Sequence, residues 1–545
     1  MPDTILAPAG AWQAAFTRRD GALLETIARI RSEEPADASK AIRWYAQLVA
    51  QASAAFQSNA ERPMMVVRAP GRVNLLGTHI DHRGGRVNPI AVRELVLVVL
   101  PRDDGRVRLV NADPAHTSVE FSLDDLLPDG LVTDWADWTL TTPMCLRALG
   151  LLGHWSSYVR AALAYFTNAW GGPGDIHGFD LYAASELPQA AGLSSSSALV
   201  VAAAIAFHLT NGRDVQPLEL AEACGQAEWY VGTRGGSGDQ AAILLGKAGH
   251  VSHVDFFPMQ VDWSPWPTGY SVVVCHSRAH AQKTANARST FNERVATYAI
   301  ALFWIKRLHP DWTPELVHLR DLLRLSLGTA KIYWMLWELP RRVMRDEIRC
   351  ALPERREELE RLFGTHDEPA EGYRVRDVCL YGLAECMRSI QLAECLQAGD
   401  IIGTGRLINL SHEGDRVTRL DESGERVPVD TGVMDEDLRR LITALESGSA
   451  EECAAAALAL QPGGYACSSP ALDELVDLAR SVEGVLGAGL IGAGIGGCVE
   501  VIVKDEAIDD LRRALLAGYY EKHGYEPFIE TMRPVEGAGA LVLPR

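Results

Sequence analysis

One short run, at 192–198, contains residue types that are well suited to chemistry. It reads Gly-Leu-Ser-Ser-Ser-Ser-Ala. A glycine and small hydroxyl residues at a helix start leave backbone N–H groups free at the positive end of the helix dipole. Such a helix start can bind a phosphate group. The alternative is an ordinary buried helix with a serine N-cap, because serine is common at that position.

The elements around this run must present it at the start of a helix. We expect a short strand near 179–183, a loop at 187–191 and a helix that continues to about Leu209. The pair Asn211-Gly212 is typical of a helix end. The predicted order is therefore strand, loop, phosphate-binding helix start.

A second polar segment lies at 68–85. It places Arg72, His79, Asp81 and His82 within about ten positions, among turn-forming glycines and a proline. A polar loop between strands is a frequent location for the binding of a small polar ligand. The alternative is a solvated turn.

A third segment, 487–498, is rich in glycine and contains overlapping GxGxxG strings. A dinucleotide-binding fingerprint needs a strand before these glycines and a helix directly after them. Here the residues 499–503 read as a strand instead. We interpret the segment as a glycine turn between two strands, which allows close backbone approach to a neighbour or a ligand.

The remaining chain divides by pattern. Residues 1–60 form a helical extension, and strands mix with helices from about residue 64 to 265. Residues 290–460 read as mostly helical, with an expected disordered loop at 420–426. The last stretch predicts helix, strand, strand and helix in the order 471–483, 486–491, 498–503 and 506–518, which suits an α+β sandwich.

The composition restricts the function classes. A chain of 545 residues exceeds one average domain. The formal net charge of -19 argues against nucleic acid or an anionic membrane as the main partner, because both need a basic face. The longest apolar run, 198–207, is too short to span a bilayer. The ten cysteines have no zinc-ligand spacing and the start of the chain has no signal-peptide pattern, so we expect a cytoplasmic protein with reduced thiols.

Together the three segments resemble the GHMP small-molecule kinases, and most closely the galactokinase branch. Residues 68–89 resemble the branch's sugar-binding signature, 188–198 its phosphate loop, and 492–498 its C-terminal glycine motif. The resemblance covers roughly 62–300 and 375–540. It implies an α+β chain with the two-domain GHMP-kinase fold.

In that fold, the extension 1–60 would precede an N-terminal α/β domain at 61–265 with the topology of ribosomal protein S5 domain 2. A ferredoxin-like C-terminal domain would occupy 266–545 and carry a helical insert at about 300–370. The sequence leaves the role of the extension, the role of the insert and the oligomeric state open.

The resemblance also implies ATP and Mg²⁺ as cofactors. The residues expected to bind ATP are Pro188, Ala191, Gly192, Leu193, Ser194, Ser195, Ser196, Ser197 and Gly494. Ser195 and Glu228 are the expected magnesium ligands, since Mg²⁺ prefers oxygen donors. Glu228 lies eleven residues before Asp239, one fewer than the branch pattern leads us to expect.

Asp239 matches the branch's catalytic aspartate, which accepts or orients the proton of the anomeric hydroxyl. Arg72 matches the arginine that steadies the developing charge. The residues expected to bind the sugar substrate are Thr78, His79, Asp81, Gly236 and Phe291. Two departures from the branch are Ala190, where the phosphate loop usually has glycine, and Phe291, near a tyrosine that often contacts the sugar.

A further departure concerns the sugar. Thr78 stands where galactokinases have a glutamate near the C6 hydroxyl, so a repulsion against a C6 carboxylate is absent. The string at 77–85 resembles the plant galacturonate kinases. We therefore expect a sugar-1-kinase acting on galacturonic acid or a related hexuronate, whose carboxylate would pair with an arginine. The candidate arginines are Arg83, Arg86 and Arg234.

Three alternatives remain open at this point. The first is a kinase for galactose, arabinose or another sugar. The second is a non-catalytic sugar and ATP sensor on the same fold, against which the presence of both Arg72 and Asp239 argues. The third is an enzyme of the same fold acting on a mevalonate-type alcohol, against which the sugar-type segment argues.

Overall fold

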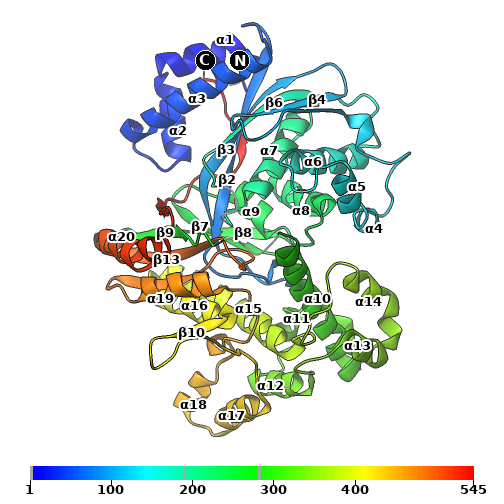
Figure 1. Ribbon diagram of the computed structural model, residues 1–545, viewed down its shortest axis with the longest axis vertical. Helices are drawn as coiled ribbons and strands as arrows, with labels where there is room; N and C mark the ends of the chain where they lie inside the picture. Colours follow the sequence, from blue (N-terminus) through cyan, green and yellow to red (C-terminus); the bar gives the residue numbers. More distant parts are fainter. Residues whose placement is uncertain (1–3, 189–191, 280–283, 545) are drawn as a thin grey trace. The chain divides into compact units, whose positions relative to one another are not determined.

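The computed structural model describes residues 4–188, 192–279 and 284–544, so Ala190 and Ala191 lie outside the described residues. The chain forms two compact units (Figure 1). The first unit comprises Met1–Val73, Pro89–Ser252 and Arg533–Arg545, and the second comprises Asn74–Asn88 and His253–Met532. Each unit is described by itself below.

A seven-stranded sheet forms the centre of the first unit. Its strands follow the order β1-β2-β3-β6-β4-β5, and β15 pairs with β2. The pairing of β4 with β6 is parallel, whereas β3 with β6 and β4 with β5 are antiparallel. The strand bounds are β1 (Ala7–Pro8), β2 (Pro63–Asn74), β3 (Pro89–Pro101), β4 (Arg106–Asn111), β5 (Val119–Ser122), β6 (Phe179–Ser185) and β15 (Gly539–Ala540).

Helices cover both faces of this sheet, which explains why β3 is buried along almost its whole length. On one face lie α1 (Ala9–Arg18), α2 (Gly21–Ile30) and α3 (Pro35–Ala55), the helices of the extension. Their apolar side chains share one core with Met64, Val96 and Tyr182 of the strands. The residues before the sheet are thus an integral layer of the first unit.

The other face carries the helices that position the polar residues of interest. α7 (Ser195–Thr210) and α9 (Gly238–Leu245) contact β3, and α7 also packs on its neighbours α6 and α8. α7 is buried from Ser197 to His208, which its almost uninterrupted apolar sequence allows. The remaining helices are α4 (Trp135–Trp138), α5 (Thr142–Ala148), α6 (Ser156–Ala169) and α8 (Pro217–Ala227).

The second unit contains a four-stranded antiparallel sheet in the order β12-β13-β9-β14. One helix, α19 (Pro470–Arg480), precedes β12, and another, α20 (Ile508–Leu515), follows β13. This βαββαβ order is ferredoxin-like, as predicted. The strands are β9 (Tyr270–His276), β12 (Val485–Leu490), β13 (Cys498–Lys504) and β14 (Ile529–Met532).

The rest of the second unit is mainly helical and has its own apolar core. Its longest helices are α10 (Thr284–Leu308), α15 (Val375–Ala398) and α16 (Ile401–Asp415). The shorter ones are α11 (Asp321–Arg324), α12 (Thr329–Glu338), α13 (Arg345–Ala351), α14 (Arg356–Phe363), α17 (Asp435–Glu446), α18 (Ala450–Ala455) and α21 (Glu521–His523). β7 (His250–Asp255) and β8 (Gln260–Pro265) form a separate pair.

The expectation of disorder at 420–426 is wrong. β10 (Thr418–Leu420) and β11 (Arg426–Pro428) form an antiparallel hairpin across this segment. The side chain of Asp421 accepts hydrogen bonds from the backbone N–H groups of Ser423 and Glu425, both at 2.9 Å, and so closes the turn.

Two further expectations concern cysteines and membranes. All ten cysteines are free thiols, as predicted. Among the described residues, none of the helices combines the length and the apolar character needed to cross a membrane.

Candidate active site

An arginine and an aspartate from distant parts of the first unit form a two-point ion pair. The Arg72 Nε donates to Asp239 Oδ1 at 2.8 Å, and its Nη2 donates to Oδ2 at 2.9 Å. The Arg72 side chain is 7% exposed, whereas the Asp239 side chain is 38% exposed. The arginine therefore acts as a fixed support, while the carboxylate remains accessible to a ligand.

Ser194 connects this pair to the start of α7. Its hydroxyl donates a hydrogen bond to Asp239 Oδ2. Ser194 is the N-cap of α7 with a left-handed φ of 55°, and no side chain caps this helix start within the described chain. A left-handed non-glycine residue costs of order 1–3 kcal/mol and is typical of functional sites. The serine thus serves Asp239, and the first N–H groups of α7 remain available for an anion.

The backbone before α7 packs closely on the strand that carries Arg72. Arg72 N donates to Leu193 O at 3.1 Å, and the guanidinium donates to Gly192 O. A Cβ on Gly71 would lie 2.4 Å from Leu193 O, so only glycine fits at that position. The structure thus brings Gly192, Leu193 and the serines 194–197 together with Arg72 and Asp239. Pro188 begins this loop, and Ala191 falls in the part that is not described.

Glu228 lies in a buried position close to the same helix. Burial raises the pKa of its carboxyl to about 7, although hydrogen bonds from Ser197 and Gln240 favour the charged form. The nearby Asp239 carboxylate raises the pKa further. Of the described residues, none donates a hydrogen bond to Glu228 Oε1, although this atom is buried. An uncompensated buried carboxylate oxygen is the kind of donor that a hard cation takes.

These donors fit Mg²⁺ in type. Glu228 offers its unpartnered oxygen, and the side-chain oxygen of Gln240 is also buried without a partner in the described part of the chain. No cluster of three His, Cys, Asp or Glu side chains suited to a metal occurs among the described residues. Mg²⁺ does not need one, because it commonly uses one or two carboxylates together with water and substrate phosphates. The serine beside Glu228 is Ser197, whereas the sequence favoured Ser195.

The sugar-type signature residues lie in the second unit. His79 has a left-handed φ of 70°, its ring stacks on Tyr465 at 4.0 Å, and its side chain is 1% exposed. The His79 Nε2 lies 3.6 Å from Asp415 Oδ1. In this structure His79 is therefore a packed residue that shapes the signature loop.

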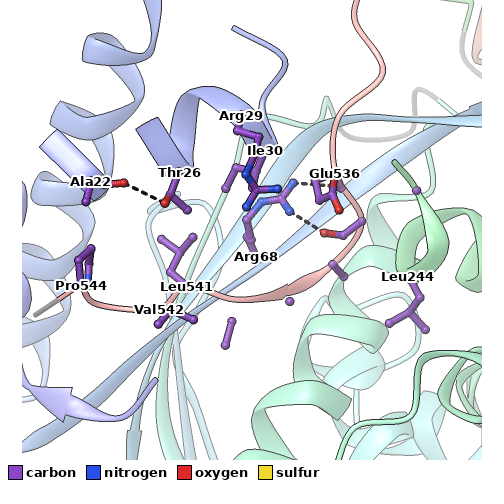
Figure 2. Close-up of a pocket in the computed structure, with 15 residues that line it drawn as sticks. Ala22, Thr26, Arg29, Ile30, Arg68, Leu244, Glu536, Leu541, Val542 and Pro544 are labelled. Carbon is purple, nitrogen blue, oxygen red and sulfur yellow. Dashed lines mark hydrogen bonds between the residues drawn. The ribbon is translucent and has the colours of Figure 1, made fainter. Parts of the chain in front are cut away.

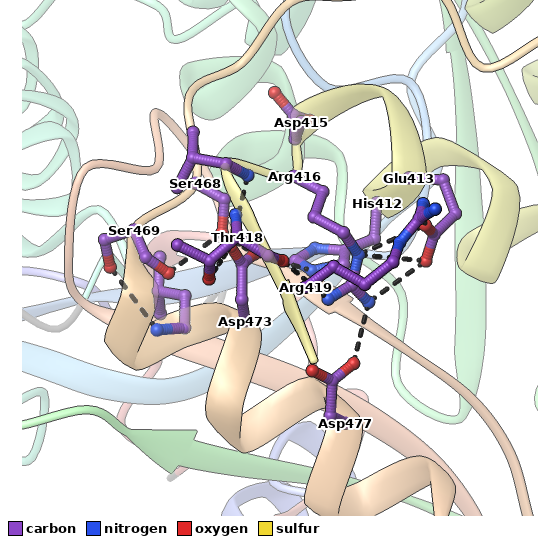
Figure 3. Close-up of polar contacts among 12 residues, drawn as sticks. His412, Glu413, Asp415, Arg416, Thr418, Arg419, Ser468, Ser469, Asp473 and Asp477 are labelled. Carbon is purple, nitrogen blue, oxygen red and sulfur yellow. Dashed lines mark hydrogen bonds and ion pairs between the residues drawn. The ribbon is translucent and has the colours of Figure 1, made fainter. Parts of the chain in front are cut away.

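Asp415 is the last residue of α16 and lies beside a polar cluster that includes Thr418, Ser468 and Asp473 (Figure 3). Its carboxylate accepts hydrogen bonds from Tyr381 Oη at 3.1 Å and Cys467 N at 3.3 Å. Close by, Asp473 accepts hydrogen bonds from Thr418 and Ser468. Buried carboxylates satisfied in this way fix the backbone around them. The cluster anchors the partners against which His79 packs.

The other predicted sugar residues occupy varied positions. Thr78 is 9% exposed, and Asp81 lies within hydrogen-bond distance of His82 Nδ1 at 2.9 Å. Phe291 lies on α10 and Gly236 in the loop before α9, both partly buried. Thr78, His79 and Asp81 belong to the second unit with Phe291, whereas Gly236 belongs to the first unit with Asp239.

Gly494 lies in the turn between β12 and β13 with a φ of 73°, which confirms the prediction of a glycine turn between two strands. A Cβ there would lie 2.0 Å from the backbone oxygen of Cys467. The close approach is thus to a neighbouring segment of the second unit. A role of Gly494 in nucleotide binding stays a prediction.

The three arginines proposed for a substrate carboxylate differ. Arg86 is already paired with Asp255 through two hydrogen bonds of 3.0 and 2.6 Å, so a substrate carboxylate would have to compete with Asp255 for it. Arg83 is buried against Tyr298 and donates to Val295 O, and burial lowers its pKa to about 10. Arg234 retains a buried Nη2 with no hydrogen-bond partner among the described residues. Arg83 likewise has a buried Nε without a hydrogen-bond partner among the described residues.

Sequence reasoning missed several contacts. Nothing in the sequence pairs Ser194 with Asp239, because the two residues are 45 positions apart. Asp415 and Tyr465 also escaped notice, although Asp415 closely follows residues 407–412, a run that also resembles the galactokinase branch. The signal that could have identified Asp415 is its position, because it is a polar residue at a helix end next to a segment that resembles the family.

Comparison with known proteins agrees with the geometry. The chain matches the GHMP kinases N terminal domain over 157–247, the galactokinase galactose-binding signature over 54–102 and the GHMP kinases C terminal domain over 434–521. Arg72 lies in the second of these segments, Asp239 in the first and Gly494 in the third.

Named relatives match over most of the chain. The galactokinase of Roseiflexus sp. (strain RS-1) is 29% identical over 482 residues, which cover 88% of this chain and 94% of that protein. The galactokinase of Chloroflexus aggregans is 28% identical, with coverage of 88% and 93%. The crystal structure of Lactococcus lactis galactokinase complexed with galactose shares the fold at a TM-score of 0.62 and 21% identity, with coverage of 91% and 99%.

These matches place the chain in a class of enzymes. It belongs to the GHMP kinases and has their two-domain fold. Within that family it is a galactokinase-like sugar kinase, a phosphotransferase.

Proposed function

We propose that this enzyme transfers the γ-phosphoryl group of ATP, with Mg²⁺, to the anomeric hydroxyl of a free sugar. The observation that carries the proposal is the Arg72–Asp239 ion pair, joined through Ser194 to the start of α7. It places a base for a hydroxyl beside a cradle for phosphate. Phosphoryl transfer depends mainly on such positioning and on charge neutralisation.

In this mechanism Asp239 orients the sugar hydroxyl and accepts its proton. Three of the four lone-pair sites of the carboxylate are used by Arg72 and Ser194, which leaves one on Oδ1 for the substrate. Arg72 keeps the carboxylate in one orientation and holds Gly192 O. The backbone N–H groups at 192–197 would take the β- and γ-phosphates.

The Mg²⁺ would be held by Glu228, a serine at 195–197 and the nucleotide phosphates. When bound, the ion would neutralise charge on the phosphates. Glu228 contributes the buried oxygen that has no partner among the described residues. Ser195 and its neighbour Ser197 are both candidates for the hydroxyl ligand.

This assignment predicts a pH-dependent need for Mg²⁺. Burial raises the Glu228 pKa to about 7. The proton must leave before a metal binds, so the half-saturating Mg²⁺ concentration should be about tenfold higher at pH 6 than at pH 8. The measurement is initial rate against Mg²⁺ at both pH values.

Matched variants isolate the contribution of Glu228. Glu228→Gln should need more Mg²⁺ at pH 8 and retain only the pH change that ATP itself produces. Glu219→Gln, on the exposed face of α8, should behave as the wild type. If the half-saturating Mg²⁺ concentration depends on pH equally in the wild type and in Glu228→Gln, then Glu228 is not a metal ligand.

Galactose is the first candidate substrate. The relatives that match most of this chain are named galactokinases, and the galactose-binding signature spans Arg72 to Asp81. Galacturonate or a related hexuronate is the second candidate. Two points favour it: Thr78 stands where the resemblance to galactokinases implies a glutamate, and Arg234 has an unpartnered Nη2 among the described residues.

A panel of free sugars tests both candidates through ATP-dependent product formation. The panel contains galactose, galacturonate, glucuronate and arabinose. Turnover of galactose well above that of the others would identify a galactokinase, and the reverse order would identify a uronate kinase. An absence of turnover with every sugar would contradict the proposed function.

The variant Thr78→Glu measures the charge effect at that position. If a hexuronate is used, the new carboxylate should lower kcat/KM for it by about tenfold or more. The kcat/KM for galactose should stay the same or rise. Thr78→Gln is the control of equal size without charge. Equal effects of Glu and Gln on the uronate would show that charge at residue 78 does not select the sugar.

A further inference from the structure

The helical extension contributes one charged side chain to the interior of the first unit. Arg31 directly follows α2 and its side chain is 14% exposed. It lies outside all three segments that match the family, which begin at residue 54. The guanidinium contacts three carboxylates: Glu33 at 3.2 Å, Glu186 at 3.1 Å and Glu94.

Glu94 links Arg31 to the strand that carries the catalytic arginine. It lies on β3 with a side chain that is 1% exposed, and it also accepts from Arg68 Nε at 2.7 Å. Burial would raise the pKa of Glu94, but Arg68 and Arg31 outweigh burial and lower it. Arg68 is four residues before Arg72 on β2. Figure 2 shows the guanidinium of Arg68 hydrogen-bonded to the segment of Glu536, whose backbone oxygen accepts at 2.9 Å.

Glu186 links Arg31 to the phosphate loop. It directly follows β6, and its N–H donates to the backbone oxygen of Glu94 at 3.0 Å. Leu187 and Pro188 come next, at the start of the loop that leads to Gly192. The Glu186 side chain is 28% exposed, so Arg31 is what holds it against the protein interior.

We propose that Arg31 is a positioning residue for nucleotide binding, through which the extension fixes the start of the phosphate loop. The proposal rests on the function proposed above. Arg31 bridges two carboxylates that come from β3 and from the loop start, on strands that pair directly. Removing its charge would leave these carboxylates to repel each other, and Glu186 would turn to water. The loop start would then lose its one ion pair among the described residues, and the N–H groups that receive the phosphates would be displaced.

The test compares ATP and sugar parameters in charge variants. Arg31→Gln is expected to raise KM for ATP about tenfold. KM for the sugar, which is galactose or whichever sugar the panel identifies, should stay within twofold of the wild-type value. Arg31→Lys should recover part of the loss, because it keeps the charge without the planar fork. Glu186→Gln should reproduce the ATP effect, and the double variant Arg31→Gln/Glu186→Gln should be no worse than Arg31→Gln.

The matched control is Arg29→Gln. Arg29 lies two residues earlier and lines a cavity of about 600 Å³ beside Arg68, with no ion pair among the described residues (Figure 2). It should keep wild-type KM values. If Arg31→Gln fails to fold, Glu186→Gln alone tests the proposal. In that variant Glu94 still pairs with both Arg31 and Arg68, so the buried ion pairs remain.

Binding of MgADP, measured by calorimetry, separates this inference from the proposed function. A weaker Kd for MgADP in Arg31→Gln and Glu186→Gln supports the positioning role, whatever sugar is used. Unchanged KM for ATP and unchanged Kd for MgADP in both variants would overturn it. So would a rise of equal size in the KM of ATP and of the sugar, which indicates general loss of structure.

Discussion

Asp239→Asn is expected to lower kcat by about a thousandfold while the sugar and MgATP still bind. The amide keeps the size of the carboxylate but cannot accept the proton of the anomeric hydroxyl, and general-base catalysis contributes typically 10²–10⁴-fold. In either orientation the amide NH₂ would also face an N–H group of Arg72, because Arg72 now donates to both carboxylate oxygens. Steady-state kcat, with substrate binding by calorimetry, measures the effect.

A matched variant separates the base from its support. Ser194→Ala removes one donor to Asp239 and leaves the carboxylate and both Arg72 contacts in place. Its kcat should fall by about tenfold, far less than in Asp239→Asn. One hydrogen bond to a charged group is worth about 1.5–3 kcal/mol, and the low end of that range corresponds to about tenfold. Turnover near the wild-type value in Asp239→Asn would show that this carboxylate is not the catalytic base.

Arg72→Met is expected to have the second largest effect, a fall in kcat of about 10²–10³-fold. The substitution leaves a carboxylate without its bidentate partner and removes the donor to Gly192 O, so it disturbs both the base and the phosphate loop. Removing the buried arginine leaves the partly exposed Asp239 carboxylate without the support that fixes its orientation. The measurement is kcat/KM for ATP and for the sugar.

Arg72→Lys provides the graded control. Lysine keeps the charge but offers one point contact in place of a two-pronged fork, so it should recover part of the kcat lost in Arg72→Met. The double variant Asp239→Asn/Arg72→Met should be little worse than Asp239→Asn alone, because the two residues act as a unit. Additive losses would mean that Arg72 acts independently of Asp239.

Much of this arrangement follows from local sequence. The run at 192–198 predicts a helix start with free N–H groups, and α7 begins at Ser195 with its N-cap at Ser194. The glycines at 487–498 predict a turn between strands, and the order of the last elements predicts an α+β sandwich, which the second unit's sheet and its helices form. These features depend on backbone rules that act within a few residues.

The parts that were missed depend on contacts between distant residues. Arg86 looked available for a substrate carboxylate until folding paired it with Asp255, 169 positions away. The His79 ring stacks on Tyr465, which is far away in the sequence, and a role of His79 in sugar binding stays a prediction. No local pattern reports which partner a polar side chain finds in the folded chain.

The helical extension illustrates the same limit. Its apolar periodicity predicts helices, and α1, α2 and α3 are present. Its contribution to the sheet core and the reach of Arg31 to Glu94 and Glu186 needed the three-dimensional structure.

The central claim is that the Arg72–Asp239 centre directs phosphoryl transfer to the anomeric hydroxyl of a sugar. The most direct test is ³¹P and ¹H NMR of the product formed from ATP, Mg²⁺ and the preferred sugar by the wild type, with Asp239→Asn alongside. The account predicts a sugar 1-phosphate, recognised by coupling of phosphorus to the anomeric proton, and its near absence in the variant. Phosphate on another carbon, or the same product rate in Asp239→Asn, would contradict it.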